Sequence, residues 1–262
     1  MILAAMAIIA VVEVAIPLHA RGHWNKAHLG PNLTLTLITF ATNLAFNAAL
    51  VVTLVQLQAA GFGLLPWLGM SSLAAGFSAV FVLDFAFYLA HVAMHTVPSF
   101  WRIHRVHHSD PVVDVTTTIR QHPAEGVIRY GFMATFAFAL GATPGAFAVY
   151  RAWSAINGLL EHANIRLPGW LDGVLSLVTT WPNMHKVHHS RIAKETNTNY
   201  GNIFSVFDRL FSTFTPSWRG ATIVYGLNGF DDPETQTASA LLGLPFRDGH
   251  SSPLTIATPP KA

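Results

Sequence analysis

The sequence predicts an all-α integral membrane protein, a helical bundle with about four to five membrane helices, and three observations support this fold class. Hydrophobic residues form 52% of the 262-residue chain and charged residues only 11%, with a mean hydropathy of +0.41. Because a soluble domain carries about 25% charged residues, most of this surface has to face something other than water. Long uncharged stretches are the second observation, and histidines that recur at helical spacing are the third.

Three apolar stretches within the first hundred residues predict three membrane helices. Residues 33–58 carry no charge and exceed the about 20 residues that cross the hydrocarbon of a bilayer. Residues 71–96 are similarly apolar, although their later half carries charged and histidine side chains. Residues 1–16 are shorter and contain Glu13. We predict a membrane helix there rather than a signal peptide, because the cationic start and the small-residue cleavage site of a signal peptide are missing.

Two shorter apolar stretches, residues 127–140 and 146–160, flank a turn at 141–145. Each is short for a span, so they predict either two spans or a hairpin that enters the bilayer partway. We assign residues 1–245 to a single domain, since the length suits one core. Residues 246–262 are polar and proline-rich and are predicted to be disordered.

The distribution of basic residues predicts the orientation in the membrane. Arg21 and Lys26 lie between the first two predicted spans, whereas residues 59–69, between the second and third, carry no charge. Four arginines follow the third span. Because Lys and Arg are in excess in cytoplasmic loops, the histidine-rich segments are predicted to face the cytoplasm.

Composition also excludes several classes of function. The chain has no cysteine, which excludes disulfides, thiolate metal sites and cysteine nucleophiles. The net charge is only +2, and no basic block interleaved with aromatic residues indicates nucleic-acid binding. The anomaly is histidine: ten of the 14 lie between His91 and His189.

Three histidine motifs stand out in this region. The first has an HxxxH pattern, in which positions i and i+4 share one face of a helix. The second and third have an HxxHH pattern and are nearly copies of each other, and a further histidine stands between them. These nine residues, which we predict to bind metal, are His91 and His95; His104, His107 and His108; His185, His188 and His189; and His162.

The number of histidines predicts two metal ions. Neutral imidazole binds Zn, Cu, Fe and Ni, and one ion takes about four to six ligands. Eight or nine convergent histidines therefore imply two ions. Such an all-nitrogen shell adds no negative charge, unlike the carboxylate-rich di-iron bundles. A site at the membrane surface also excludes water, and ionisable residues at membrane depth are usually functional.

Four further residues are candidates for supporting the site. Asp84 precedes His91 by two helical turns on the same face, so we predict that it accepts a hydrogen bond from a ligand histidine, with helix packing as the alternative. His122 either supports the site or caps the next helix. Glu161 is turned by about 100° from its neighbour on a helix, and it is a candidate support or ligand. Asn199 is the fourth. The histidines outside this region, predicted to lie in loops, are His19, His23, His28 and His250.

In combination, these motifs resemble those of the fatty acid hydroxylase / sterol desaturase superfamily. The segments that carry the resemblance are HVAMH, HRVHHSD, EHANIRLP and MHKVHHS, followed by NYGN at 199–202 and FDRLF at 207–211, and the resemblance covers residues 84–214. It implies a cytoplasmic helical cap over a di-iron centre held by the nine histidines, with O2 as co-substrate and two electrons from outside. Zinc is expected in place of iron as an expression artefact. Family members with a fuller set have a histidine where this chain has Gly158, which predicts an open or water-filled position at one metal.

The function expected from the motifs and the resemblance is hydroxylation of a lipid-like substrate: a fatty acyl chain, a sterol or a lipid head group. Desaturation of a similar substrate is an alternative that the sequence does not separate. From another class, a histidine-based membrane metal transporter would place its ligands near the midplane, whereas these cluster at the ends of spans. A bis-histidine haem carrier would need only paired ligands, so it leaves most of the clustered histidines unexplained.

A separate electron donor, ferredoxin-like or cytochrome-like, is also expected, because no haem or iron–sulfur domain is fused within this sequence. Cations lie among the histidine motifs, and we predict that they form a docking surface for an acidic donor. The alternative is that they contact lipid phosphates or reflect the positive-inside bias. These residues are Arg102, Arg105, Lys186, Arg191 and Lys194.

Overall fold

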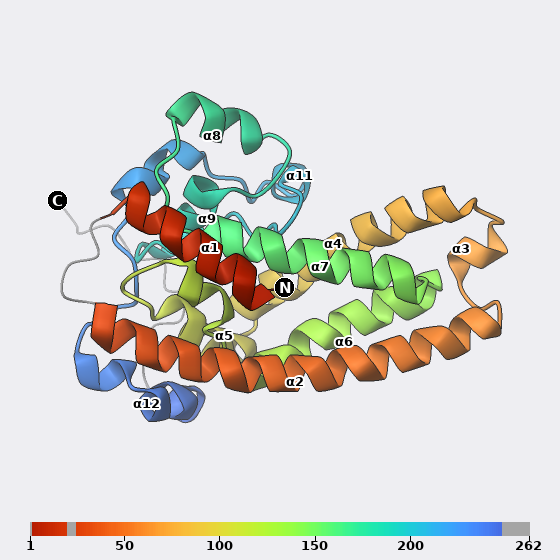
Figure 1. The fold of residues 1–262 in the computed structure, drawn as a ribbon, viewed down its shortest axis with the longest axis horizontal. Coiled ribbons are helices and arrows are strands. Elements are labelled where there is room, and N and C mark those ends of the chain that lie inside the picture. The colour runs from red at the N-terminus through yellow and green to blue at the C-terminus, as the bar shows by residue number, and fades with distance from the viewer. Residues whose placement is uncertain (1, 20–24, 248–262) are drawn as a thin grey trace.

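The structure, a computed structural model, describes residues 2–19 and 25–247. Every regular element in these residues is helical, which confirms the predicted all-α class (Figure 1). The long helices are α1 (Ile2–Ala15), α2 (Asn25–Ala59), α4 (Ser72–Thr96), α6 (Pro123–Leu140) and α7 (Pro144–His162). The shorter elements are α3 (Leu64–Trp67), α5 (Pro98–His108), η2 (Val115–Ile119), α8 (Gly169–Leu175), α9 (Pro182–His188), α10 (Ala193–Thr196), α11 (Val206–Leu210), η3 (Ser217–Thr222), η4 (Pro233–Gln236), α12 (Ala238–Gly243) and η5 (Leu244–Phe246).

Helices α2, α4, α6 and α7 form an elongated bundle that ends at α3 (Figure 1). Its core contains Leu54, Leu83, Met133 and Phe147, all buried. At the α3 end the α6–α7 turn meets the α2–α3 turn so closely that a Cβ on Gly63 would lie 2.3 Å from the backbone of Gly141. Both glycines also have positive φ, so this approach requires glycine at both positions.

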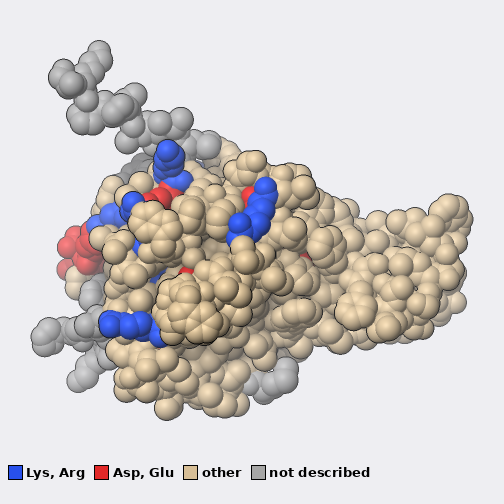
Figure 2. Space-filling view, turned by 90° about the horizontal axis from the view of Figure 1, so that it is seen from above, with Lys and Arg blue, Asp and Glu red and all other residues tan. Residues whose placement is uncertain are grey.

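Two segments are long and apolar enough to cross a membrane: residues 28–67, which include α2 and α3, and helix α4. In the most apolar windows of these segments only 17% and 39% of the residues are buried, unlike those of a soluble core helix. Figure 2 shows Lys, Arg, Asp and Glu gathered at the wide end of the molecule, while the narrow end carries none on this face. Exposed Trp67, Leu73 and Phe77 lie at that narrow end. These features indicate a membrane protein.

The sequence predicted four to five membrane helices, whereas only these two segments of the described residues are long and apolar enough to cross a membrane. Helix α1 has 14 residues and is therefore about 21 Å long, shorter than the about 30 Å of hydrocarbon. It packs against α7 and η2 through Met6 and Leu159. Its buried Glu13 accepts hydrogen bonds from the backbone nitrogens of Val115 and Asn164, both at 2.8 Å. This carboxylate therefore joins α1 to the start of η2 and to the segment after α7. Helices α6 and α7 form a hairpin, and their span or re-entry stays a prediction.

The wide end of the molecule is a helical cap over the last turns of α4, formed by α5, η2 and the segment after α7 (Figure 1). The final elements, η4, α12 and η5, pack on α2 and α5 through a cluster that includes Leu35, Trp101 and Leu241. Phe246 ends η5, and residues 248–262 of the predicted tail lie outside the described residues. The single-domain assignment of residues 1–245 stays a prediction.

The prediction that His28 lies in a loop is wrong, because it is a buried residue of α2. Its Nδ1 lies 3.0 Å from Asp110 Oδ1, and its Nε2 lies 3.3 Å from Asp114 Oδ1. Arg120, also buried, donates to Asn32 Oδ1 at 2.8 Å, so α2 is bound to the segment that follows α5. Long-range pairing of this kind leaves no local sequence signal. His19 lies after α1 as expected, and His23 and His250 fall outside the described residues.

Candidate metal centre

The structure brings all nine predicted ligand histidines together in two adjacent sets. Set A has five histidines and set B has four, and within each set one nitrogen per residue lies within 4.8 Å of the others. The rings of His108 in set A and His189 in set B have centroids 4.6 Å apart, so the sets are neighbours. All nine residues are buried. Set A is His91, His95, His104, His108 and His188; set B is His107, His162, His185 and His189.

Each HxxHH helix supplies both sets. Because consecutive helical residues are turned by about 100°, the i and i+4 histidines share a face and the histidine between them points elsewhere. In α5, His104 and His108 face set A, whereas His107 faces set B. In α9 the distribution is reversed: His188 faces set A, and the i and i+4 pair faces set B. The repeated motif thus makes two sites from two short helices.

The nitrogen positions fit metal ions. Two nitrogens bound to one ion at about 2.1 Å and at right angles lie about 3.0 Å apart. In set B, His162 Nε2 lies 3.1 Å from His107 Nε2, 3.0 Å from His185 Nε2 and 3.2 Å from His189 Nε2. In set A, the buried Nε2 atoms of His91, His95 and His188 have no hydrogen-bond partner. Buried polar atoms are rarely left without a partner, and a metal ion would serve all of them.

Hydrogen bonds on the far side of the rings select the ligating tautomer. Backbone carbonyls accept from Nδ1 of four histidines: Tyr200 O from His91 at 2.9 Å, Thr198 O from His188 at 2.7 Å, Arg120 O from His107 at 3.3 Å, and Gly158 O from His162 at 2.8 Å. A proton on Nδ1 leaves the lone pair on Nε2, which faces the centre of the set. Burial also holds the pKa of His104, His107, His108, His185 and His189 well below the usual value, so these imidazoles are neutral.

Two supporting side chains were missed in the sequence. Glu125 Oε2 lies 3.1 Å from His104 Nδ1, and Asn197 Oδ1 lies 3.2 Å from His95 Nδ1. A carboxylate on the outer nitrogen orients a ligand histidine and raises its basicity. Glu125 lies in the first turn of α6, where an acidic residue interacts favourably with the helix dipole. That common role explains its presence in the sequence, so nothing pointed to a contact with a histidine. Asn197 had no signal, because only the fold brings it to α4.

Asp84 contacts a loop rather than a histidine, which corrects the prediction. Its carboxylate accepts from Asn202 Nδ2 at 3.2 Å and from the backbone nitrogens of Ile203 at 3.1 Å and Phe204 at 2.9 Å. This is the packing role given as the alternative. The same loop supplies Tyr200 O to His91, so Asp84 influences that ring through the backbone.

The other supporting candidates differ in their distance from the histidines. His122 caps α6, since its Nδ1 accepts from Ala124 N at 3.2 Å, as in the second of its two predicted roles. Asn199 Nδ2 donates to Met184 O at 2.9 Å and to Thr215 O at 3.0 Å, so it joins α9 to the segment that follows α11. Glu161 lies nearest to the ligands: its Oε1 is 3.8 Å from His162 Nδ1 and 3.9 Å from His185 Nε2.

Two cations assigned to the docking surface are buried, and for them that prediction is wrong. Lys186 is fully buried and donates to the carbonyls of His162 at 3.0 Å and Ala163 at 2.8 Å, which neutralises the C-terminal end of α7. Burial lowers the pKa of Lys186 to about 8. Arg105 donates to Leu244 O at 2.7 Å. In both residues, side-chain N–H groups donate to backbone carbonyls that only the fold brings close.

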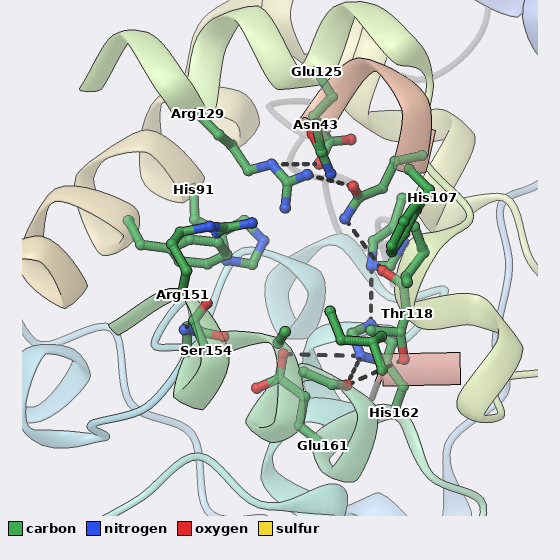
Figure 3. Close-up of a pocket in the computed structure, with 18 of the residues that line it drawn as sticks. Asn43, His91, His107, Thr118, Glu125, Arg129, Arg151, Ser154, Glu161 and His162 are labelled. Carbon is green, nitrogen blue, oxygen red and sulfur yellow. Dashed lines mark hydrogen bonds and ion pairs between the residues drawn. The ribbon is translucent and has the colours of Figure 1, made fainter. Parts of the chain in front are cut away.

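A pocket opens beside both histidine sets (Figure 3). It contains about 1040 Å³ of space not filled by protein atoms, open solvent at its mouth included. Its apolar lining includes Phe40, Leu44 and Phe87, and five of the nine histidines border it. Gly158, the position predicted to leave one metal with an open site, also lines the pocket.

The fold and the site define a class of protein: a helical membrane protein whose cap holds two neighbouring sets of histidines suited to metal ions. The chain belongs to the fatty acid hydroxylase family, whose family model matches residues 76–213. This confirms the family inferred from the motifs.

Three curated relatives illustrate the range of the family. The chain is 32% identical over 152 residues to alkylglycerol monooxygenase of Caenorhabditis elegans, covering 56% of this chain and 28% of the relative. It is 32% identical over 148 residues to ornithine lipid hydroxylase OlsE of Rhizobium tropici, covering 56% and 44%. It is 31% identical over 137 residues to very-long-chain aldehyde decarbonylase GL1-8 of Oryza sativa subsp. indica, covering 51% and 49%. The chain thus matches at most about half the length of these relatives. No solved structure matches.

Proposed function

We propose that the protein is a membrane di-iron hydroxylase that uses O2 and two external electrons to hydroxylate a lipid-like substrate: a fatty acyl chain, a sterol or a lipid head group. The observation that carries the proposal is the pair of histidine sets, buried, neutral and open to one pocket. The relatives include an alkylglycerol monooxygenase and an ornithine lipid hydroxylase, which supports oxidation of a lipid.

The histidines of set A would hold one iron ion and those of set B the other. When bound, the ions supply the activation of O2, and the overall change is R–H + O2 + 2 e⁻ + 2 H⁺ → R–OH + H2O. The chain itself orients the imidazoles through Glu125, Asn197 and the backbone carbonyls. The apolar lining of Phe40, Leu44 and Phe87 keeps water from the C–H bond to be oxidised.

Desaturation remains the alternative within the same site, since removal of two hydrogens needs the same metals and pocket. Metal transport is less well supported, because both sets lie at the cap end of α4 and not at the middle of several spans. Product analysis decides between hydroxylation and desaturation.

Metal analysis and an oxygen-labelling assay test the proposal together. Purified protein supplemented with iron is expected to bind two ions per chain without a haem absorption band, and zinc is expected after overexpression in unsupplemented medium. With a reductant and isotopically labelled O2, a membrane lipid extract should yield a product that contains the label. A single ion per chain after supplementation contradicts the di-metal site. An unsaturated product without label indicates a desaturase.

The electron donor is proposed to be a separate ferredoxin-like or cytochrome-like protein that docks on the cap near Arg102, Arg191 and Lys194, which all retain surface exposure. Exposed charges accelerate association and are screened over about 8–10 Å at physiological salt. Turnover with a reconstituted donor should therefore fall as ionic strength rises. Lys194→Glu should raise KM for the donor more than Lys194→Gln, with metal content unchanged. If the KM for the donor changes neither with ionic strength nor in the two variants, the docking site lies elsewhere.

A further inference from the structure

Arg151 is one of the two arginines that line the pocket. It lies on α7, and its Nε donates to Asn47 Oδ1 of α2 at 3.2 Å. Its guanidinium carbon lies 5.3 Å from the centroid of the Tyr130 ring. These contacts hold the guanidinium at the pocket wall while using one of its five N–H donors. Figure 3 shows Arg151 and Arg129 bordering the cavity that also reaches His91 and Glu161.

No carboxylate among the described residues pairs with Arg151. Two glutamates line the pocket, Glu125 and Glu161. Glu125 Oε1 lies 3.6 Å from Arg129 Nε, so this carboxylate compensates the other arginine of the pocket. Glu161 lies beside the set B histidines, ten residues after Arg151 and therefore about 15 Å further along the helix axis. Within residues 2–19 and 25–247, the charge of Arg151 therefore has no carboxylate partner.

The surroundings make an uncompensated cation costly. The same helices supply the pocket with apolar side chains, Phe40, Leu44 and Ala155, as well as the polar Asn43, Asn47 and Ser154. A charge in such a setting is expensive unless a ligand or an ion pair compensates it. Asn43, one helical turn before Asn47, also lines the pocket, and its buried side-chain oxygen has no hydrogen-bond partner. To bind an anion, Asn43 would turn its NH2 toward the ligand, because the amide oxygen only accepts hydrogen bonds.

We propose that Arg151, with Asn43 and Asn47, forms a subsite for the anionic group of an amphiphile, a carboxylate or a phosphate. The guanidinium pairs with the anion, and the aliphatic part extends along the apolar side chains toward the histidines. Arg151 precedes Gly158 by seven residues, about 10 Å of helix, so the chain carbon at the metal centre lies several bonds from the anionic group. That last step rests on the proposed function, whereas anion binding does not.

Binding without turnover tests the subsite. Purified full-length protein, loaded with metal in neutral detergent, is titrated with radiolabelled palmitic acid, and unlabelled compounds compete. The competitors are palmitic acid, monopalmitoyl lysophosphatidic acid and hexadecanol, which share one chain and differ in head group. A charge-assisted hydrogen bond contributes on the order of ten-fold in affinity, so at least one anionic compound should bind about ten-fold or more tighter than hexadecanol. The better of the two anionic compounds identifies carboxylate or phosphate.

Substitutions locate the effect. Arg151→Gln should remove most of the preference for the anion and change hexadecanol binding little, while Arg151→Lys keeps part of it. Arg166→Gln, which removes an exposed arginine outside the pocket, is the matched control and should bind like the wild type. Metal content reports on folding of each variant. Equal binding of hexadecanol and both anions by the wild type overturns the proposal, as does an anion preference that survives Arg151→Gln. Failure of hydroxylation with anion selectivity intact would count against the proposed function alone.

Discussion

Replacing His189 by alanine is expected to lower the metal content from two ions per chain to about one, and to reduce turnover by at least about 100-fold. His189 Nε2 lies 3.2 Å from both His162 Nε2 and His185 Nε2, so its loss removes one of the four nitrogens of set B. Loss of an outer partner of a metal ligand costs about 10–100-fold in affinity or activity, and loss of the ligand itself should cost more. Quantitative metal analysis and single-turnover assays measure the two effects.

His188→Ala provides the comparison with set A. Four nitrogens remain there after the substitution, so this variant should retain more metal than His189→Ala while also losing turnover. His250→Ala, which changes a histidine outside the three sequence motifs, should change neither quantity. Full activity in both the His188 and His189 variants, or equal metal loss in the His250 variant, would refute the assignment of the two sets.

Asp84→Ala is expected to destabilise the protein by about 3 kcal/mol or more, because it leaves two buried donors and one partly buried donor without an acceptor. A change of that size corresponds to a fall in Tm of roughly 6–12 °C for a chain of this length. The loop that would be released also carries Tyr200 O, the acceptor of His91, so metal affinity should fall with stability. Thermal unfolding and metal titration in the same detergent measure both.

Asp231→Ala is the control for a carboxylate that is mostly exposed. Asp231 pairs with Arg191 at the surface, where removal of an ion pair costs about 1 kcal/mol or less. Asp84→Asn should lie between the two, since an amide oxygen still accepts a hydrogen bond. An Asp84→Ala variant as stable as the wild type would show that the 202–204 loop is held by other contacts.

A second buried carboxylate, Asp208 of α11, resembles Asp84 because it accepts from the backbone of the same loop. Asp208 accepts from the backbone nitrogens of Tyr200 and Gly201, each at 2.8 Å, and burial raises its pKa to about 6. A Cβ on Gly201 would lie 2.9 Å from Asp208 Oδ2, so the loop passes too close for a larger residue. Asp84 and Asp208 thus fix one loop from two helices, and that loop positions His91.

The sequence by itself determined the fold class, the family and the identity of the histidines that meet. These properties follow from local features. Uncharged runs as long as residues 33–58 need a non-aqueous surface, and the i, i+4 spacing of His91 and His95 places both imidazoles on one face as soon as a helix forms. The open metal position at Gly158 stays a prediction, drawn from the resemblance of the motifs.

Tertiary structure alone decided which histidine joins which set, and which charged residues reach the surface. Helical spacing separates His107 from His108, but only the packing of α5 against other helices decides which set each of them joins. Lys186 and Arg105 look like surface cations in sequence, yet both are buried and donate to carbonyls of distant segments. His28, Glu125 and Asn197 acquired their partners in the same way. Such pairings join residues far apart in the chain, so no local period or spacing encodes them, and only packing of the helices brings them within hydrogen-bond distance.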